Sequence, residues 1–249
     1  MNTGDGSSAA DKRAAAKDFF KRLENYLNTN LPTVTTVNED ALQRKKEYLL
    51  TKNAKLLDFE PRFFKNHVVC AVTEFLTSKS EYGLDRPVAA IQAVLAEGWA
   101  DLRNCASGTP ASRQIYPYKK TLAATLKTAR KDWWGTGKVL SNSCPDLAVR
   151  LPDGPSMVFE GKLFRSGGPD AAKSAIVAGI YDCFFYRALP TLRKTTEAYA
   201  SGYDYACFLA YDASPDSTLR KSWQDINPQV AQSCWDALNI HVMIVRREV

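Results

Sequence analysis

The order of apolar and polar positions predicts that the first half of the chain is helical. Residues 11–28 place apolar side chains three and four positions apart, as on one face of an amphipathic helix. Further helices are predicted over 39–52 with Asn38 as the N-cap, over 61–79, over 86–104 and over 118–134. The Pro- and Thr-rich segment 31–37 and the segment 105–117 are predicted to connect them.

The second half changes to a pattern that includes strands. Residues 146–151 alternate between apolar and polar side chains, residues 152–155 form a Pro-Asp-Gly-Pro turn signal, and residues 156–164 predict a second strand. A long apolar helix is predicted over 171–189. Short strands over 205–211 and 240–245 enclose a helix over 227–238. The order of elements predicts a mixed α/β fold, with a central sheet flanked by helices and a helical N-terminal part.

Composition and length agree with one globular domain. The chain has 249 residues, of which 45% are hydrophobic and 24% are charged. We expect a disordered N-terminus over residues 1–10, then one domain over 11–249. That domain has a mostly helical part (11–134) and a sheet core (135–249). The sequence shows neither an apolar run of the roughly 20 residues that span a bilayer nor a secretory signal. A cytoplasmic protein without a membrane segment is therefore expected.

The cysteines and histidines argue against a zinc site. The six cysteines are scattered without a C-x-x-C pair, and the two histidines, His67 and His241, are not at ligand spacing. We expect the cysteines to be free thiols, as in a reducing compartment.

Two acids and one lysine fall on the predicted hairpin. Glu160 and Lys162 are two residues apart on the second strand, so their side chains share one face, while Met157, Phe159 and Leu163 face a core. Whether Asp146 joins them depends on the register of the hairpin. We predict an odd-numbered loop, such as 152–154 or 153–155, which sets Asp146 opposite Glu160 or Lys162.

Such a group of side chains suits metal-dependent phosphodiester hydrolysis. The carboxylates of Asp146 and Glu160, with the backbone carbonyl of Gly161, offer the hard oxygen ligands that Mg²⁺ or Mn²⁺ prefers. A metal so held activates a bound water, and Lys162 is placed to orient that water and offset phosphate charge.

The motif Pro145-Asp146, thirteen residues, then Glu160-Gly161-Lys162 resembles the signature of the PD-(D/E)xK nuclease superfamily, which includes many restriction endonucleases. The resemblance covers roughly 135–212. It implies a restriction-endonuclease-like core, metal-ligand roles for Asp146 and Glu160, and a water-orienting role for Lys162. It also implies a DNA substrate and a prokaryotic or phage origin. One branch of the superfamily has a glutamine on the following helix, and residues 173–186 contain none.

The alternative interpretation is an ordinary cross-strand ion pair on the solvated face of a hairpin. Against it, Glu160-x-Lys162 is the only acidic-x-lysine triplet among 27 acids. Many members of the superfamily carry one more acid on a preceding helix. Glu74, within the apolar arc of the helix over 61–79, and Glu97, on the flank of the helix over 86–104, are the two candidates, and the sequence does not choose between them.

A basic segment is the candidate DNA contact. Residues 111–138 contain seven basic side chains and one acid, Asp132, so this segment carries the net charge of +6. Its interleaved aromatic residues suit either stacking on nucleotides or packing in a core. The candidate contacts are Lys119, Lys120, Lys127, Arg130, Lys131 and, on the helix after the motif, Lys173.

Cutting both strands of DNA needs two such sites, so a homodimer is expected. The rival hypothesis is a non-catalytic nucleic-acid-binding protein that keeps a vestigial nuclease fold.

Overall fold

The computed structural model describes residues 8–78, 94–96, 146–151, 155–188, 203–226 and 228–248. In chain order, its elements are α1 (Ala9–Asn30), α2 (Val34–Thr51), the 3₁₀ turn η1 (Ala54–Leu57), α3 (Phe59–Phe63), the π-helical segment η2 (Phe64–Val68), α4 (Val69–Thr77), β1 (Val94–Ala96), β2 (Leu147–Arg150), β3 (Ser156–Phe164), α8 (Pro169–Ala188), β4 (Tyr205–Asp212), α10 (Thr218–Gln224), α11 (Pro228–Leu238) and β5 (Ile240–Val245). The mixed α/β class predicted from the sequence is confirmed.

The strands form one mixed sheet in the order β1-β2-β3-β4-β5. β1, β2 and β3 are antiparallel neighbours, whereas β3, β4 and β5 run parallel. β3 joins the antiparallel and the parallel parts of the sheet. It pairs with β4 over Met157–Phe164 but with β2 only over Ser156–Phe159. The second half of β3 therefore has a sheet neighbour on one side and lies beyond the end of β2 on the other.

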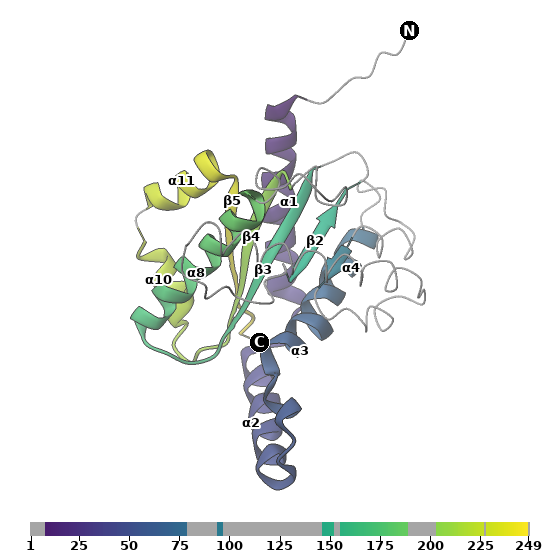
Figure 1. The fold of residues 1–249 in the computed structure, drawn as a ribbon, viewed down its shortest axis with the longest axis vertical. Helices are drawn as coiled ribbons and strands as arrows, with labels where there is room; N and C mark the ends of the chain where they lie inside the picture. The colour runs from purple at the N-terminus through teal and green to yellow at the C-terminus, as the bar shows by residue number, and fades with distance from the viewer. Residues whose placement is uncertain are drawn as a thin grey trace, which may run out of the picture.

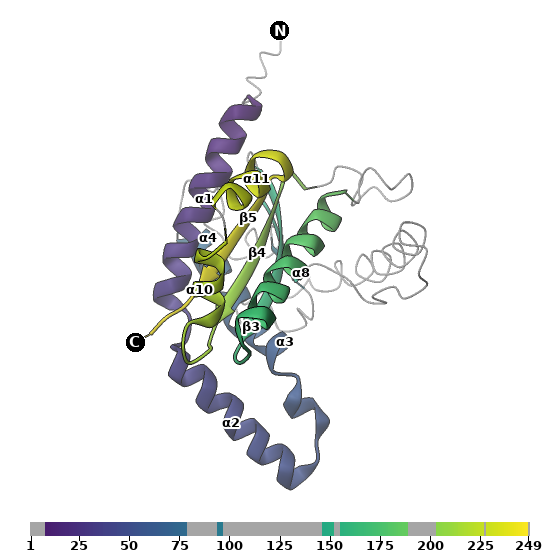
Figure 2. The same cartoon turned by 90° about the vertical axis from the view of Figure 1, so that its left-hand side faces the viewer.

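Helices cover both faces of the sheet (Figures 1 and 2). α1 and α4 pack on one face, where Phe20, Leu23 and Phe75 meet Phe159 in the first core. α8 packs on the other face, with α10 beside it, and there Ile176 and Cys183 meet Val158 and Phe208 in a second core. The alternation of side chains along β3 sends odd positions to the first core and Val158 and Phe164 to the second. α2 and η1 extend away from this body.

The first helix matches its prediction and the second begins earlier than expected. α1 begins at Ala9, and Ser8 with Asp11 forms a capping box, so residues 8–10 belong to an ordered helix start. α2 begins at Val34 with Thr33 as N-cap, so the predicted connection over 31–37 ends at Thr33. Asn38 is not a cap. It lies within α2 and its side-chain amide donates to the Ala213 carbonyl at 2.9 Å. The prediction of Asn38 as the cap is therefore wrong, because this tertiary hydrogen bond engages its side chain inside the helix.

Two further helix predictions need correction. The helix predicted over 61–79 is present from Phe59 to Thr77, but its middle is the π-helical η2. The helix predicted over 86–104 is wrong at its centre, because Val94–Ala96 forms β1 against β2. A three-residue apolar run carries little propensity of its own, and pairing with the edge of β2 decides its conformation.

Among the described helices, none has both the length and the apolar content that a bilayer crossing requires.

The second half follows its prediction closely. The hairpin, the helix after it and the two later strands are all present within two residues of their expected bounds. α10 was not predicted, because its seven residues contain too few apolar positions to indicate a helix.

The cysteines differ from expectation at one position. Cys183, Cys207 and Cys234 are buried free thiols, as predicted. Cys70 is disulfide-bonded, so the expectation of free thiols is wrong there. Cys105 and Cys144 lie outside the described residues.

His241 of β5 is a titratable group inside the layer between α1 and the sheet. Its ring stacks on Phe20 with centroids 4.9 Å apart and meets the edge of Trp235. Its Nε2 atom is buried and has no hydrogen-bond partner among the described residues. Burial, and then the positive charge of Lys17, lower the pKa of His241 from 6.5 to about 4. The imidazole is therefore neutral in the folded protein at pH 7.

This lowered pKa predicts a loss of stability in mild acid. Between pH 6.5 and 4 the unfolded chain binds a proton at His241 that the folded chain does not, so the free energy of unfolding falls as pH falls through that window. The shift corresponds to roughly 3 kcal/mol. His241→Phe, which keeps the stacked ring, should lose less stability than wild type between pH 7 and pH 4.5 in urea unfolding. Equal losses in the two proteins would contradict the assignment.

Candidate active site

The register of the β2–β3 hairpin brings Asp146 to the second strand of the motif. Leu147 pairs with Phe159, and Arg150 with Ser156. The amide of Leu151 also approaches the Pro155 carbonyl at 3.5 Å. The connection between the paired ends is odd-numbered, as predicted, and the same register extended by one residue sets position 146 opposite Glu160.

Asp146 ends the hairpin by bonding to β3 with both its backbone and its side chain. Its amide donates to the Phe159 carbonyl at 3.1 Å. Its carboxylate Oδ2 accepts the Gly161 amide at 2.7 Å. The Asp146 side chain thus accepts the hydrogen bond of a β3 amide that lies beyond the end of the β2–β3 pairing. The bond fixes the Asp146 carboxylate beside the Glu160–Gly161 peptide.

Glu160 and Lys162 lie on the face of β3 that α8 covers. Val158 and Phe164, on the same face, are buried in the second core, whereas Glu160 and Lys162 between them are only partly buried. One carboxylate oxygen of Glu160, Oε2, is buried. The predicted sharing of one face by Glu160 and Lys162 agrees with this burial pattern.

Cys183 on α8 is a buried free thiol close to the motif strand. Burial raises its pKa well above 9, and the negative charges of Glu160, Asp182 and Asp146 raise it further. The Cys183 thiol thus faces the backbone of Glu160 from the α8 side of the sheet.

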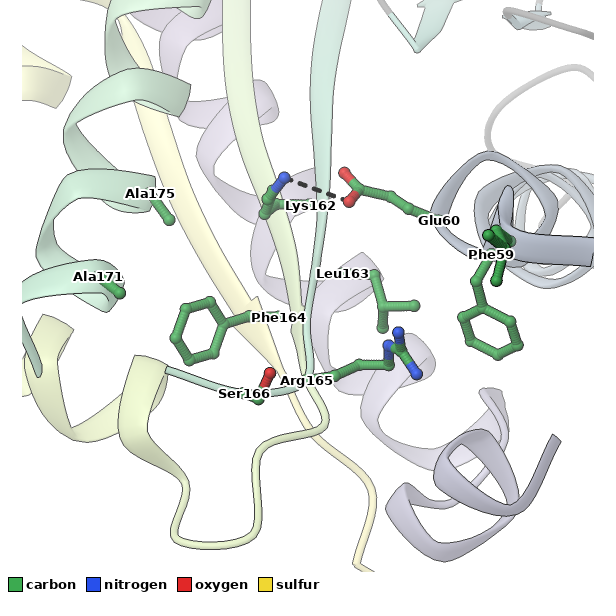
Figure 3. Close-up of a pocket in the computed structure, with 10 residues that line it drawn as sticks. Phe59, Glu60, Lys162, Leu163, Phe164, Arg165, Ser166, Ala171 and Ala175 are labelled. Atoms are coloured by element: carbon green, nitrogen blue, oxygen red, sulfur yellow. Dashed lines mark hydrogen bonds and ion pairs between the residues drawn. The ribbon is translucent and has the colours of Figure 1, made fainter. Parts of the chain in front are cut away.

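Lys162 is held by an acid that the sequence analysis did not select. Its Nζ lies 3.2 Å from Oε2 of Glu60 on α3, and the two side chains are 42% and 37% exposed. Figure 3 shows the two side chains pointing toward one another. An ion pair this exposed contributes at most about 1 kcal/mol to stability, so its importance is the position that it gives to Nζ. Glu60 precedes Lys162 by 102 residues, and no local pattern marks such a contact.

The remaining predicted site residues lie elsewhere. Glu74 on α4 is exposed rather than within the apolar arc, and its described side-chain contact is a 3.4 Å hydrogen bond from the Tyr26 hydroxyl. Lys173 is exposed on the first turns of α8. Several predicted residues lie outside the described ranges: Glu97, Lys119, Lys120, Lys127, Arg130 and Lys131.

A second buried acid, Asp212 at the end of β4, has a structural role. Its Oδ1 accepts from the amide and hydroxyl of Ser214, and its Oδ2 accepts from the amide of Arg220 in α10. Arg246 binds its carbonyl at 3.0 Å. These bonds fasten the turn after β4 and the start of α10, so Asp212 is a capping group.

Comparisons with models of protein families, with curated proteins and with solved structures found no match to this chain. An assignment of function therefore rests on the geometry of the site.

The chemistry of the donor set decides which metal would fit. Among the described residues, no group of three or more His, Cys, Asp or Glu side chains is arranged to hold a metal ion. A closed zinc-type site built from described side chains is thus absent. Mg²⁺ is usually held by one or two carboxylates and keeps several waters. Asp146 and Glu160, adjacent through the hairpin register, fit that requirement.

Gly161 lets an aromatic ring pack directly on the motif strand. A Cβ at this position would lie 2.4 Å from Cε1 of Phe64 and 2.7 Å from its Cζ. Phe64 belongs to η2 and is buried. The segment that follows Glu60 is therefore pressed against β3 at the glycine between Glu160 and Lys162.

This contact predicts that Gly161→Ala destabilises the protein by about 1–3 kcal/mol through overpacking. Gly168→Ala is the matched control, because no atom lies within 4 Å of its added Cβ. Adding Phe64→Leu to Gly161→Ala should recover part of the loss. Denaturant midpoints of the four proteins provide the measurement, and equal midpoints for the two single alanine variants would refute the packing argument.

Proposed function

We propose that this protein is a Mg²⁺-dependent nuclease that hydrolyses phosphodiester bonds of DNA at Asp146, Glu160 and Lys162. The observation that carries the proposal is the bond from the Gly161 amide to the Asp146 carboxylate, which holds that carboxylate beside Glu160. Mn²⁺ is the alternative metal. The biological class that fits best is a restriction-type or defence endonuclease, acting as a homodimer where both strands are cut.

Each residue of the motif has a role in this proposal. Asp146 and Glu160, with the Gly161 carbonyl, would hold the metal. When bound, the metal would lower the pKa of a coordinated water and offset charge on the phosphate. Lys162 would orient the attacking water and contact a phosphate oxygen. Glu60, 3.2 Å from Lys162 Nζ, would keep that ammonium in position.

The arrangement of elements supports the same proposal. The resemblance to the PD-(D/E)xK superfamily implies a helix, a mixed sheet that carries the motif, and a further helix. In this chain α4 precedes β1, β2 and β3, and α8 then crosses to β4, parallel to β3. The acids and the lysine fall where the antiparallel hairpin gives way to the parallel part of the sheet.

The direct test is cleavage of plasmid DNA in Mg²⁺. Asp146→Asn, Glu160→Gln and Lys162→Met should each reduce the cleavage rate by about 100-fold or more, because each removes a charge that the transition state needs. Chelation of the metal should abolish cleavage by the wild type, and Mg²⁺ or Mn²⁺ should restore it.

Thermal unfolding of each variant is the control for folding. Full cleavage by folded Asp146→Asn and Lys162→Met would refute the assignment of the site. A wild-type protein that binds DNA but cleaves neither DNA nor RNA would favour the rival function, a non-catalytic nucleic-acid-binding protein.

Glu60 and Glu74 can be compared through the same substitution. We expect Glu60→Gln to lower kcat about tenfold with little change in KM, because it loosens Lys162 without removing a ligand for substrate. Glu74→Gln, whose described side-chain contact is with Tyr26, should leave kcat within about twofold of wild type. The opposite order would return the auxiliary role to Glu74.

A further inference from the structure

A pocket opens beside Lys162, between α3 and the first turns of α8, at the end of β3 (Figure 3). Its volume is about 400 Å³, which is within the range of small-ligand sites. Its apolar wall is formed by Leu57, Phe59, Leu163, Phe164, Ala171 and Ala175, and its polar groups are Glu60, Lys162, Arg165 and Ser166. We name it the Arg165 pocket.

Arg165 differs from the other charged groups of this pocket, because no carboxylate of the described residues pairs with it. Its guanidinium carbon lies 4.9 Å from the centroid of the Phe59 ring, a cation–π distance. Phe59 is buried, so the ring is a fixed support. Among the described residues no carboxylate forms an ion pair with Arg165. Arg44, 6.0 Å from the same ring, differs because it pairs with Asp40 at 2.9 Å.

The charges of the lining favour an anion. Glu60 and Lys162 offset one another through their 3.2 Å ion pair. Arg165 therefore leaves the lining with one positive charge. Its planar guanidinium presents a fork of N–H donors that matches a phosphate. The apolar wall, from Phe59 across to Ala171 and Ala175, offers contact to the uncharged part of a nucleotide.

We infer that the Arg165 pocket binds a backbone phosphate of the DNA strand, about three nucleotides from the phosphate that is cleaved. This inference rests on the proposed nuclease function, because that function places the cleaved phosphate at Lys162 and so fixes where the DNA strand reaches Arg165. Lys162 and Arg165 are three residue steps apart along extended backbone, a span of roughly 10 Å. That span equals about three nucleotides of rise along one DNA strand. Arg165 is thus a substrate-positioning residue, not a metal ligand.

The test measures DNA binding without divalent metal, so that it does not depend on cleavage. A short fluorescent duplex is titrated with protein at several salt concentrations. Arg165→Ala should raise Kd about tenfold through loss of a charge-assisted hydrogen bond, and should lower the slope of log K against log salt by about 0.9, one phosphate contact. Arg165→Lys should keep the slope and bind more weakly than wild type.

Two matched controls locate the effect. Lys21→Ala removes an exposed charge from α1, across the sheet from α8, and should leave Kd within about twofold of wild type. Ala171→Phe adds bulk to the pocket wall without changing charge, and should weaken binding. Ser174→Phe adds the same bulk at an exposed α8 position outside the lining and should not.

The outcomes separate this inference from the proposed function. An unchanged salt slope in Arg165→Ala, wild-type affinity in Ala171→Phe, or failure of the wild type to bind the duplex would each overturn it. Cleavage in Mg²⁺ together with an unchanged slope would overturn the inference alone. Binding with the expected slopes but without cleavage would keep the pocket as a phosphate site and remove the nuclease.

Discussion

The hydrogen bond from the Gly161 amide to the Asp146 carboxylate is the constraint on which the candidate site depends. A sheet strand that loses a neighbour exposes amides that need acceptors. β3 loses β2 after Phe159, and the side chain of Asp146 supplies the next acceptor. One bond thereby closes the hairpin and sets a carboxylate at the fork between the antiparallel and parallel parts of the sheet. The same fork leaves room for α3 and η2, which bring Glu60 to Lys162 and Phe64 to Gly161.

The two faces of β3 explain why charged groups are tolerated in the middle of the protein. Met157, Phe159 and Leu163 point into the first core, where α1 and α4 exclude water. On the α8 face, Glu160 and Lys162 lie between the buried residues Val158 and Phe164 and are themselves only partly buried. Isolated burial of either charge would be costly. The partial exposure of Lys162 and its pairing with Glu60 avoid most of that cost.

The sequence predicted those features that local patterns control. The alternation over 156–164 identified the faces of β3, and the turn signal at 152–155 allowed an odd register that the structure confirms. The errors arose where distant contacts decide. Val94–Ala96 is a strand because β2 offers it an edge, and Asn38 lies inside a helix because Ala213 accepts its amide. Glu60 was missed for the same reason, since 102 residues separate it from Lys162.

Burial alone does not identify a functional acid in this fold. Asp212 is the more deeply buried carboxylate, yet its two oxygens accept hydrogen bonds from Ser214 and Arg220, which lie close to it in the chain. These bonds stabilise the turn after β4. Asp146 lies at a similar strand boundary, but its partner is an amide of the neighbouring strand, and a second carboxylate adjoins it through the hairpin register. The register thus sets two carboxylates from neighbouring segments opposite one another, whereas Asp212 is bound by donors close to it in the chain.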